Sequence, residues 1–215
     1  MRQIAKQREP ASLTAYRRTR DSNYDDYREK DELRDALVAE QRSLCCYCMG
    51  RIRTDWGSMK IEHWKSQRRH SREQLKYQNL LGACMGGVGQ PPDLQHCDTR
   101  KRDRDLQWNP ANPAHHIETR ISYGFDGTIS SNNTVFDEQL NDVLNLNLPR
   151  IKSNRRSSLT AMLEWWKSQK NKLHRPPPKA VLEREIELRT NGNGELTQYS
   201  QVAVWFLRDK LAGMP

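Results

Sequence analysis

The sequence is poor in apolar residues. Only 35% of its 215 residues are hydrophobic, phenylalanine occurs three times, and the mean hydropathy is −0.99. No apolar run approaches the roughly 18 residues that a membrane-spanning helix requires, and no apolar segment of a signal peptide follows the basic first residues. We therefore expect a polar, cytoplasmic protein with a small core, no membrane partner, and a surface that other molecules cover.

Cysteine is absent outside one short stretch. All five cysteines lie between residues 45 and 97, and clustered cysteines in a reducing compartment are metal ligands more often than disulfides. Cys45-x-x-Cys48 is typical of a zinc knuckle, in which a tight turn brings two thiolates to one ion and Gly50 would supply the unusual backbone angle. The four zinc ligands that we expect are Cys45, Cys48, Cys84 and Cys97.

The second pair of zinc ligands is less regular than the first. An insertion at residues 85–92 separates Cys84 from Cys97, so His96 is a rival for the fourth ligand position. Four thiolates around zinc would pin the two ends of a segment that has too few apolar residues to hold itself together. Cys46 is expected to be a buried, inert thiol that points away from the metal.

Negative charge is in deficit. Lys and Arg number 36 against 27 Asp and Glu, which gives a net charge of +9 and a pI near 9.5. Binding of basic residues to a nucleic acid is favourable because it releases the counterions condensed on the phosphates, so a nucleic acid is the expected partner. Residues 150–175 are strongly basic and contain the single acid Glu164, although such a run can also be a solvated helix face. The expected phosphate contacts in this run are Arg150, Lys152, Arg155 and Arg156.

A second site is indicated between the cysteines. The stretch that ends at His63 alternates as a short strand does, which places Glu62 and His63 on opposite sides. A lone histidine is usually structural, but here Glu62 precedes it, Asn79 follows sixteen positions later, and Asp98 comes directly after a cysteine. In this order the four residues, within the stretch 45–101, resemble the HNH endonuclease family.

The resemblance implies a two-stranded hairpin and a helix around one divalent ion, with a zinc site that ties the hairpin to the helix. It implies His63 as the general base that takes a proton from water, and Asn79 as the residue whose amide braces the loop and orients His63. Glu62 and Asp98 would hold a magnesium or manganese ion, and Asp98 stands where relatives often have histidine or asparagine. One base and a metal held by carboxylates supply the activated water and the charge neutralisation that phosphodiester cleavage requires.

Basic residues follow Asp98 on the helix that the resemblance predicts. They can neutralise neighbouring phosphates, although at least half of the side chains in residues 98–105 also fit a solvated helix of mixed charge. These basic residues are Arg100, Lys101, Arg102 and Arg104.

The wider sequence is similar to one group within that family. The opening of residues 1–4, the motif at 79–84 and the later stretch 144–147 together resemble the PtuB-type HNH proteins of Septu anti-phage systems, some of which act beside retrons. This resemblance implies an SMC- or ABC-like ATPase of the PtuA type as partner in a hetero-oligomer, with a retron reverse transcriptase and its msDNA as further candidates. The sequence contains no P-loop, so any ATP dependence would come from another chain.

The expected fold is α+β, with a zinc-stapled ββα-metal core, flanking helices and a mainly helical C-terminal part. We expect three parts: a basic arm and helix in residues 1–42, the HNH nuclease core with its four-cysteine zinc site in 43–110, and a basic hairpin and helices for partner or nucleic-acid binding in 111–215.

Local patterns add detail to the flanking parts. Residues 1–20 should be extended, and 24–42 should form an amphipathic helix that packs on the cysteine-rich segment. Asp126-Gly127 indicates the turn of a hairpin, and Pro149 should interrupt or restart the helical pattern that follows. The paired aromatic residues of the later helices are expected to pack in the core or against a partner rather than to stack on bases.

Two functions remain open. The first is an endonuclease effector of anti-phage defence, acting on DNA by default, with RNA, including transfer RNA, as the alternative because the chemistry acts on the phosphate and need not read the sugar. The second is a non-catalytic zinc module that binds nucleic acid or scaffolds an ATPase. The zinc site and the basic run fit both functions. Only the first explains why Glu62, His63, Asn79 and Asp98 occur together.

Overall fold

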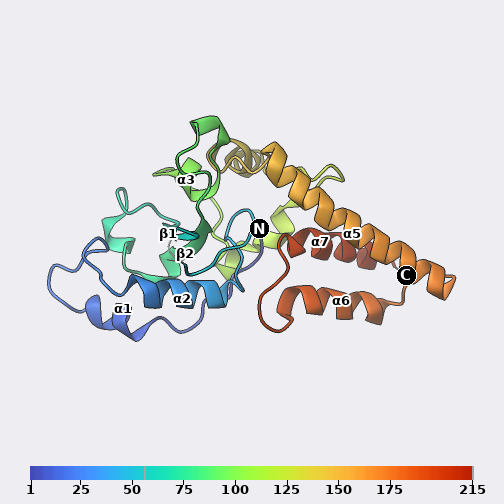
Figure 1. Cartoon of the computed structure of the whole chain (residues 1–215), viewed down its shortest axis with the longest axis horizontal. Coiled ribbons are helices and arrows are strands. Elements are labelled where there is room, and N and C mark those ends of the chain that lie inside the picture. Colours follow the sequence, from blue (N-terminus) through green and yellow to red (C-terminus); the bar gives the residue numbers. More distant parts are fainter. Residues whose placement is uncertain (56, 215) are drawn as a thin grey trace.

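The computed structural model describes residues 1–55 and 57–214 and combines helices with two small antiparallel sheets. The main elements in chain order are α1 (Ala11–Tyr16), α2 (Lys30–Glu40), β1 (Met59–His63), β2 (Leu80–Cys84), α3 (Cys97–Lys101), β3 (Ser122–Tyr123), β4 (Ile129–Ser130), α4 (Thr134–Glu138), α5 (Pro149–Leu173), α6 (Lys179–Asn191) and α7 (Ser200–Ala212). The molecule is elongated, with α1, α2 and the first sheet at one end and α5, α6 and α7 at the other (Figure 1). The expected mixture of helices and small sheets, mainly helical in its last part, is confirmed.

The N-terminal arm differs from the prediction. Residues 1–20, expected to be extended, contain the helix α1, whose Leu13 is fully buried in a cluster with Leu33 and Leu37 of α2. Such apolar contacts stabilise a helix that is too short to form alone. The helix α2 is shorter than the predicted 24–42 because the residues before it form turns.

Helix α2 is fixed to the first sheet by the side chain of Gln41. Its Oε1 accepts a hydrogen bond from the Gly82 N–H at 2.6 Å, and its Nε2 donates to the carbonyls of Gly82 and Leu44 at 2.8 Å each. A Cβ at residue 82 would lie 3.2 Å from Gln41 Nε2 and 2.8 Å from Ile52 Cδ1, so glycine permits the close approach of Gln41 to the strand. The predicted packing of this helix on the cysteine-rich segment is therefore confirmed.

Strands β1 and β2 form a hairpin that is followed by α3. The register places Glu62 opposite Leu81 and His63 opposite Leu80, and α3 packs on β2. The strand predicted up to His63 is confirmed. The helix is shorter than the expected 98–105, because Arg102 has a φ of 52°, which is outside the helical region.

The second hairpin, β3 and β4, has its turn where the Asp126-Gly127 dipeptide predicts it. The Gly127 N–H donates to the Gly124 carbonyl at 2.9 Å, and a Cβ at residue 127 would lie only 2.0 Å from the Lys152 carbonyl oxygen of α5. A residue other than glycine therefore cannot occupy the turn without displacing α5. The long helix begins at Pro149, as expected for a proline that restarts a helix.

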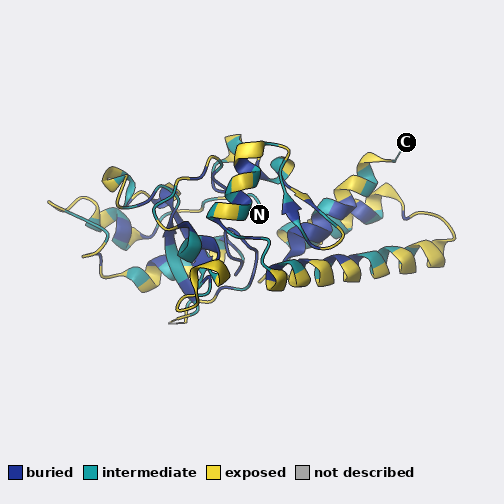
Figure 2. Cartoon of the chain, turned by 90° about the horizontal axis from the view of Figure 1, so that it is seen from above, coloured by how far each residue is buried: buried dark blue, intermediate teal, exposed yellow. Residues whose placement is uncertain are grey.

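Helix α7 lies between α5 and α6 (Figure 1). Most of its first half is buried, whereas the second half of α5 is largely exposed (Figure 2). The ring centroids of Trp166 and Phe206 are 6.1 Å apart, and those of Tyr123 and Trp205 are 6.0 Å apart, so these aromatic residues pack as predicted. No helix in the described part of the chain, α5 included, is long and apolar enough to cross a membrane.

Backbone hydrogen bonds tie the segment between α6 and α7 to the first cysteine turn and to the residues just before it. The Tyr199 N–H donates to the Met49 carbonyl at 3.0 Å, and the Leu196 N–H donates to the Arg42 carbonyl at 3.2 Å. Asn154 of α5 adds a hydrogen bond from its amide to the Tyr199 hydroxyl at 3.0 Å. These parts also share an apolar core, so they are packed as one unit.

Candidate functional site

Four cysteine sulfurs converge where the first hairpin meets α3. The residues are Cys45, Cys48, Cys84 and Cys97, and their sulfurs all lie within 4.8 Å of one another. The Cys48–Cys84 separation is 3.7 Å and the Cys45–Cys97 separation is 3.9 Å. Four sulfurs at about 2.3 Å from one zinc ion would be about 3.8 Å apart in a tetrahedron. The predicted set of thiolates therefore has the geometry to hold a metal such as zinc.

The knuckle turn differs from the prediction in the role of its glycine. Met49, not Gly50, has the left-handed backbone angle, with a φ of 69°. Gly50 is needed for space, because a Cβ there would lie 3.3 Å from both Cys48 Sγ and the Tyr199 hydroxyl. The Gly50 N–H also points to Cys48 Sγ at 3.4 Å, and such a contact favours the thiolate form of this cysteine.

His96 lies beside the four sulfurs and has the contacts of a hydrogen-bond donor to them. Its Nδ1 is 3.2 Å from Cys97 Sγ, and its Nε2 is 3.4 Å from an Nη atom of Arg150. A guanidinium can only donate, so Nε2 accepts and the proton resides on Nδ1, facing the sulfur. With four sulfurs already within reach of one ion, His96 is not needed as a ligand. Cys46 is buried as predicted, and burial raises the pKa of its thiol.

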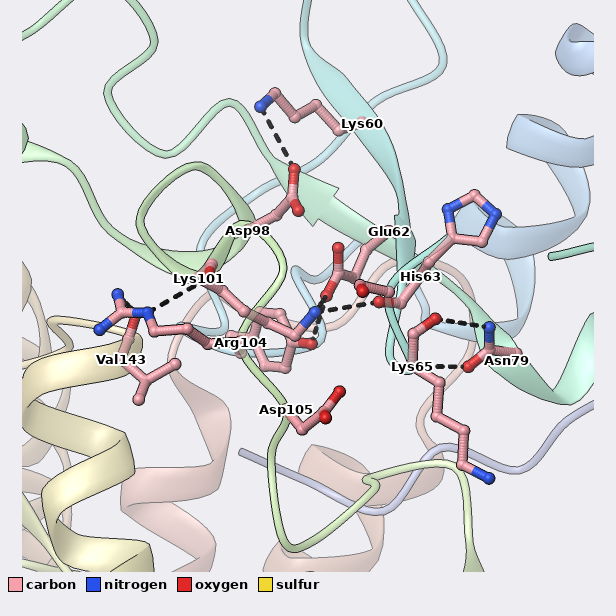
Figure 3. Close-up of polar contacts among 12 residues, drawn as sticks. Lys60, Glu62, His63, Lys65, Asn79, Asp98, Lys101, Arg104, Asp105 and Val143 are labelled. Atoms are coloured by element: carbon pink, nitrogen blue, oxygen red, sulfur yellow. Dashed lines mark hydrogen bonds and ion pairs between the residues drawn. The ribbon is translucent and has the colours of Figure 1, made fainter. Parts of the chain in front are cut away.

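Each of the two predicted carboxylates is paired with a lysine (Figure 3). Glu62 is 2% exposed, accepts a hydrogen bond from the Tyr47 hydroxyl at 2.7 Å and lies 2.8 Å from Lys101 Nζ. Asp98 lies 3.2 Å from Lys60 Nζ. Burial and the neighbouring Asp98 raise the pKa of Glu62 well above its usual range, and the Lys101 ammonium opposes this shift without cancelling it. Burial acts in the same sense on Asp98, but hydrogen bonding with Glu62 and the charge of Lys60 outweigh it and lower its pKa, so Asp98 ionises first.

The contacts of His63 leave one of its ring nitrogens, Nδ1, unprotonated. Its Nε2 is 3.0 Å from the Gln74 carbonyl, and because a carbonyl only accepts, the proton resides on Nε2 and the lone pair on Nδ1. The Tyr24 ring meets the imidazole edge-on at 4.4 Å, and burial lowers the pKa of His63, which favours its neutral form. The imidazole is turned away from the Glu62 carboxylate, as strand alternation predicts (Figure 3).

Asn79 braces the loop that follows β1. Its Oδ1 accepts from the Lys65 N–H at 2.8 Å, and its Nδ2 donates to the carbonyls of Lys65 and Glu73 at 3.0 and 3.1 Å. Figure 3 shows the paired contacts with Lys65, two residues after His63. The amide therefore fixes the backbone on both sides of the turn, which is the bracing geometry that the resemblance implies.

Lys101 is not available to phosphates, contrary to the prediction. Its side chain is fully buried, and besides pairing with Glu62 its ammonium donates to the His63 carbonyl at 3.0 Å. A long cationic side chain becomes buried in this way only where fixed acceptors satisfy it. Lys101 therefore serves inside the site as a counter-charge to the Glu62 carboxylate.

Arg104 is also engaged inside the fold. Its guanidinium donates to four backbone carbonyls, those of Arg100, Lys101, Asp142 and Val143, and so closes the end of α3 (Figure 3). Arg102 is exposed and Arg100 is half-buried, and with Arg69 of the loop after β1 they line a hollow of about 430 Å³. Sequence reasoning missed Arg69, although the basic stretch 65–72 directly after Glu62 and His63 was a signal for it.

Arg155 on α5 is a further correction. It is 2% exposed, and its guanidinium donates to the carbonyls of Gly127 and Leu146 at 2.6 and 2.8 Å and to Asn147 Oδ1 at 2.9 Å. A guanidinium held by buried acceptors cannot reach a phosphate, so the prediction for this residue is wrong. Its role is to fasten the turn of the second hairpin to α5.

The remaining basic residues predicted for this helix reach the surface. Arg150 and Arg156 are exposed, and Lys152 is paired with Asp126 at a distance of 2.6 Å. Contact of these three residues with phosphates therefore stays a prediction.

We expect Arg155→Met to lower the free energy of unfolding by about 2–4 kcal/mol, because it leaves buried acceptors without a donor. The matched variant Arg156→Met, on the exposed side of the same helix, should change it by less than about 0.5 kcal/mol. Urea unfolding monitored by tryptophan fluorescence measures both. Equal stability of the two variants would contradict the fastening role of Arg155.

Two residues of the carboxylate site were not predicted, Lys60 and Tyr47. Strand alternation contained the signal for Lys60, because residues two apart on a strand share a side and Lys60 therefore lies beside Glu62. Tyr47 lies within the knuckle, where the neighbouring cysteines gave no reason to connect it with a carboxylate.

No protein-family model matches the chain, and no curated protein matches it. The function must therefore be argued from the site. Its elements are a tetrad of cysteine sulfurs, two adjoining carboxylates with lysine partners, and an imidazole followed by a loop that an amide braces.

Proposed function

We propose that the chain is a metal-dependent endonuclease of the HNH type, which hydrolyses phosphodiester bonds of nucleic acids. The observation that supports this most is that one hairpin and one short helix hold together the four residues that the resemblance assigns to catalysis. Glu62 and Asp98 adjoin closely enough to shift each other's pKa, and the His63 loop is held by Asn79. A non-catalytic module requires none of these contacts.

The donor set is compatible with a hard divalent cation. Carboxylate oxygens are the ligands that magnesium prefers, and one or two of them suffice when water and phosphate complete the shell. Glu62 and Asp98 supply these oxygens, and the ammonium groups of Lys101 and Lys60 now occupy positions next to them. A magnesium or manganese ion held there would neutralise charge on the transition-state phosphorane and on the departing oxygen.

His63 has the protonation state that a general base needs. With its proton on Nε2 and held by the Gln74 carbonyl, Nδ1 can take a proton from a water molecule as the water oxygen attacks phosphorus. The Gln74 carbonyl then stabilises the imidazolium that forms. Arg102, Arg100 and Arg69 would position the flanking phosphates.

We also infer a cytoplasmic role in anti-phage defence within a complex with an SMC- or ABC-like ATPase of the PtuA type, alongside a retron reverse transcriptase and its msDNA in retron-linked systems. This inference rests on the sequence resemblance to PtuB-type proteins. DNA is the favoured substrate and RNA the alternative.

One observation favours a second candidate, a non-catalytic zinc module. Both carboxylates already have a lysine partner, so their charges are balanced without a cation. A protein that only bound nucleic acid could retain these ion pairs as structural contacts. Turnover in the presence of magnesium separates the two candidates.

The direct test is a cleavage assay of the purified chain, alone and with its ATPase partner, on plasmid DNA and on total RNA. We expect cleavage to require magnesium or manganese. Protein that has been treated with EDTA and then freed of it should stay inactive until one of these metals is added back. The cleaved pool identifies the substrate class. If a folded, zinc-loaded preparation cuts neither pool with either metal, the binding-module function becomes the better explanation.

A further inference from the structure

A hollow of about 680 Å³ opens beside the zinc centre and has no role in the function proposed so far. It lies between the loop of residues 85–96, which contains the insertion at 85–92, and the first turn of α5. Its volume falls within the range of about 300–1,000 Å³ that is typical of small-ligand sites. The hollow is therefore large enough for one nucleotide.

The walls of this hollow are apolar and exposed. Val88 and Leu94 each have 48% of their surface exposed, although both are aliphatic and face the same hollow. Gln90 and Ser58 add hydrogen-bonding groups and Arg150 adds a positive charge, while no carboxylate is among the described residues that line the hollow. Apolar walls with a few polar groups and one cation suit a planar, weakly polar ring that carries an anionic group.

Three contacts connect this hollow to the carboxylate site. Asp98 pairs with Lys60, the Lys60 ammonium donates to Thr99 Oγ1 at 3.0 Å, and Thr99 Oγ1 donates to the Met85 carbonyl at 2.8 Å. Met85 lines the hollow. The hollow and Asp98 are therefore joined by one short chain of contacts, which puts a nucleic acid with its scissile phosphate at Asp98 within reach of the opening.

We propose that this hollow binds an unpaired nucleotide of the substrate, with the base against Val88 and Leu94, its polar edge towards Gln90 and Ser58, and a phosphate at Arg150. A base inside a duplex is stacked and cannot enter such a site, so the preferred substrate contains single-stranded or locally unpaired nucleotides. The assignment rests on the proposed function, because it takes the nucleic acid at Asp98 as its starting point.

The test is a binding measurement that does not depend on cleavage. The ligands are fluorescein-labelled oligonucleotides of one sequence, as single strands and as duplexes, in DNA and in RNA. Zinc-loaded protein that carries His63→Ala is added to each of them, and fluorescence anisotropy measures binding. The further variant Val88→Ala/Leu94→Ala should weaken binding of the single strand about tenfold and of the duplex hardly at all. The control variant Val135→Ala/Leu188→Ala truncates two equally exposed aliphatic residues elsewhere and should change neither affinity.

Abasic substitutions then locate the bound nucleotide. Removing the base at one position of the single strand should lower its affinity for the protein with intact Val88 and Leu94. The same removal should not change its affinity for Val88→Ala/Leu94→Ala. The proposal would be overturned if that variant and its control bound every oligonucleotide with equal affinity. It would also be overturned if removing the base at any position of the single strand left its affinity unchanged. These outcomes are independent of cleavage, so a failed nuclease assay with an intact binding pattern would count against the nuclease function alone.

Discussion

His63→Ala should lower metal-dependent cleavage by about 100- to 10,000-fold, the usual contribution of a positioned general base. The variant removes the nitrogen that is free to accept a proton, while the thiolates, Glu62 and Asp98 stay in place. Single-turnover cleavage of the pool identified in the assay measures the rate. Zinc content by atomic absorption and the circular dichroism spectrum should both match those of the unaltered protein.

His70→Ala is the matched control for this prediction. His70 lies in the loop that follows His63, is partly exposed, and contacts Asp105 at 3.2 Å rather than the carboxylate site. Its removal should leave the cleavage rate within about twofold, because a surface pair of this kind contributes little. Cleavage that survives in His63→Ala, or that falls equally in both variants, would eliminate His63 as the general base.

Cys48→Ala should abolish stoichiometric zinc binding and lower Tm by about 10 °C or more, because much of the folding free energy of such a segment comes from the metal. Removing one of four sulfurs leaves an open coordination site and three thiolates in a buried space. Zinc released to a chromophoric chelator and calorimetric unfolding measure the two effects.

Cys46→Ala provides the comparison, since Cys46 is just as buried and belongs to the same turn but is not one of the four converging sulfurs. It should keep its zinc and lose no more than a few degrees of Tm, as expected for the removal of one buried sulfur atom. Loss of zinc in Cys46→Ala, or full zinc binding in Cys48→Ala, would require a different ligand set.

Local patterns predicted the parts of the structure that depend on neighbouring residues. The strand up to His63 follows from alternation, the turn at Asp126-Gly127 from the backbone angle that glycine allows, and the restart at Pro149 from the missing N–H of proline. The convergence of the four cysteines was predictable because a Cys-x-x-Cys pair with two further cysteines nearby in the sequence is typical of a metal site. Each of these inferences uses residues that are close in sequence or unusual in chemistry.

Whether a long basic side chain is buried or exposed was not predictable in this way. Lys101 and Arg155 look like surface residues in the sequence, yet each is buried because acceptors from other segments converge on it. Lys101 meets the His63 carbonyl and the Glu62 carboxylate, and Arg155 meets the carbonyls of Gly127 and Leu146. Arg104 similarly depends on the carbonyls of residues 142 and 143, about forty positions away. Such arrangements arise only once the chain is packed, so neither composition nor periodicity distinguishes them from the exposed Arg102 and Arg156.

The hydrogen bonds that join Tyr199 to Met49 and Leu196 to Arg42 have a consequence for biosynthesis. A nascent chain that has emerged only as far as α5 already carries the four converging cysteines, which could hold a metal such as zinc. The donors that complete the knuckle, however, lie about 150 positions further along, and contacts of such separation form late. Metal capture would therefore precede the docking of α7, and the fold around the four cysteines would be completed only after nearly all of the described chain has left the ribosome.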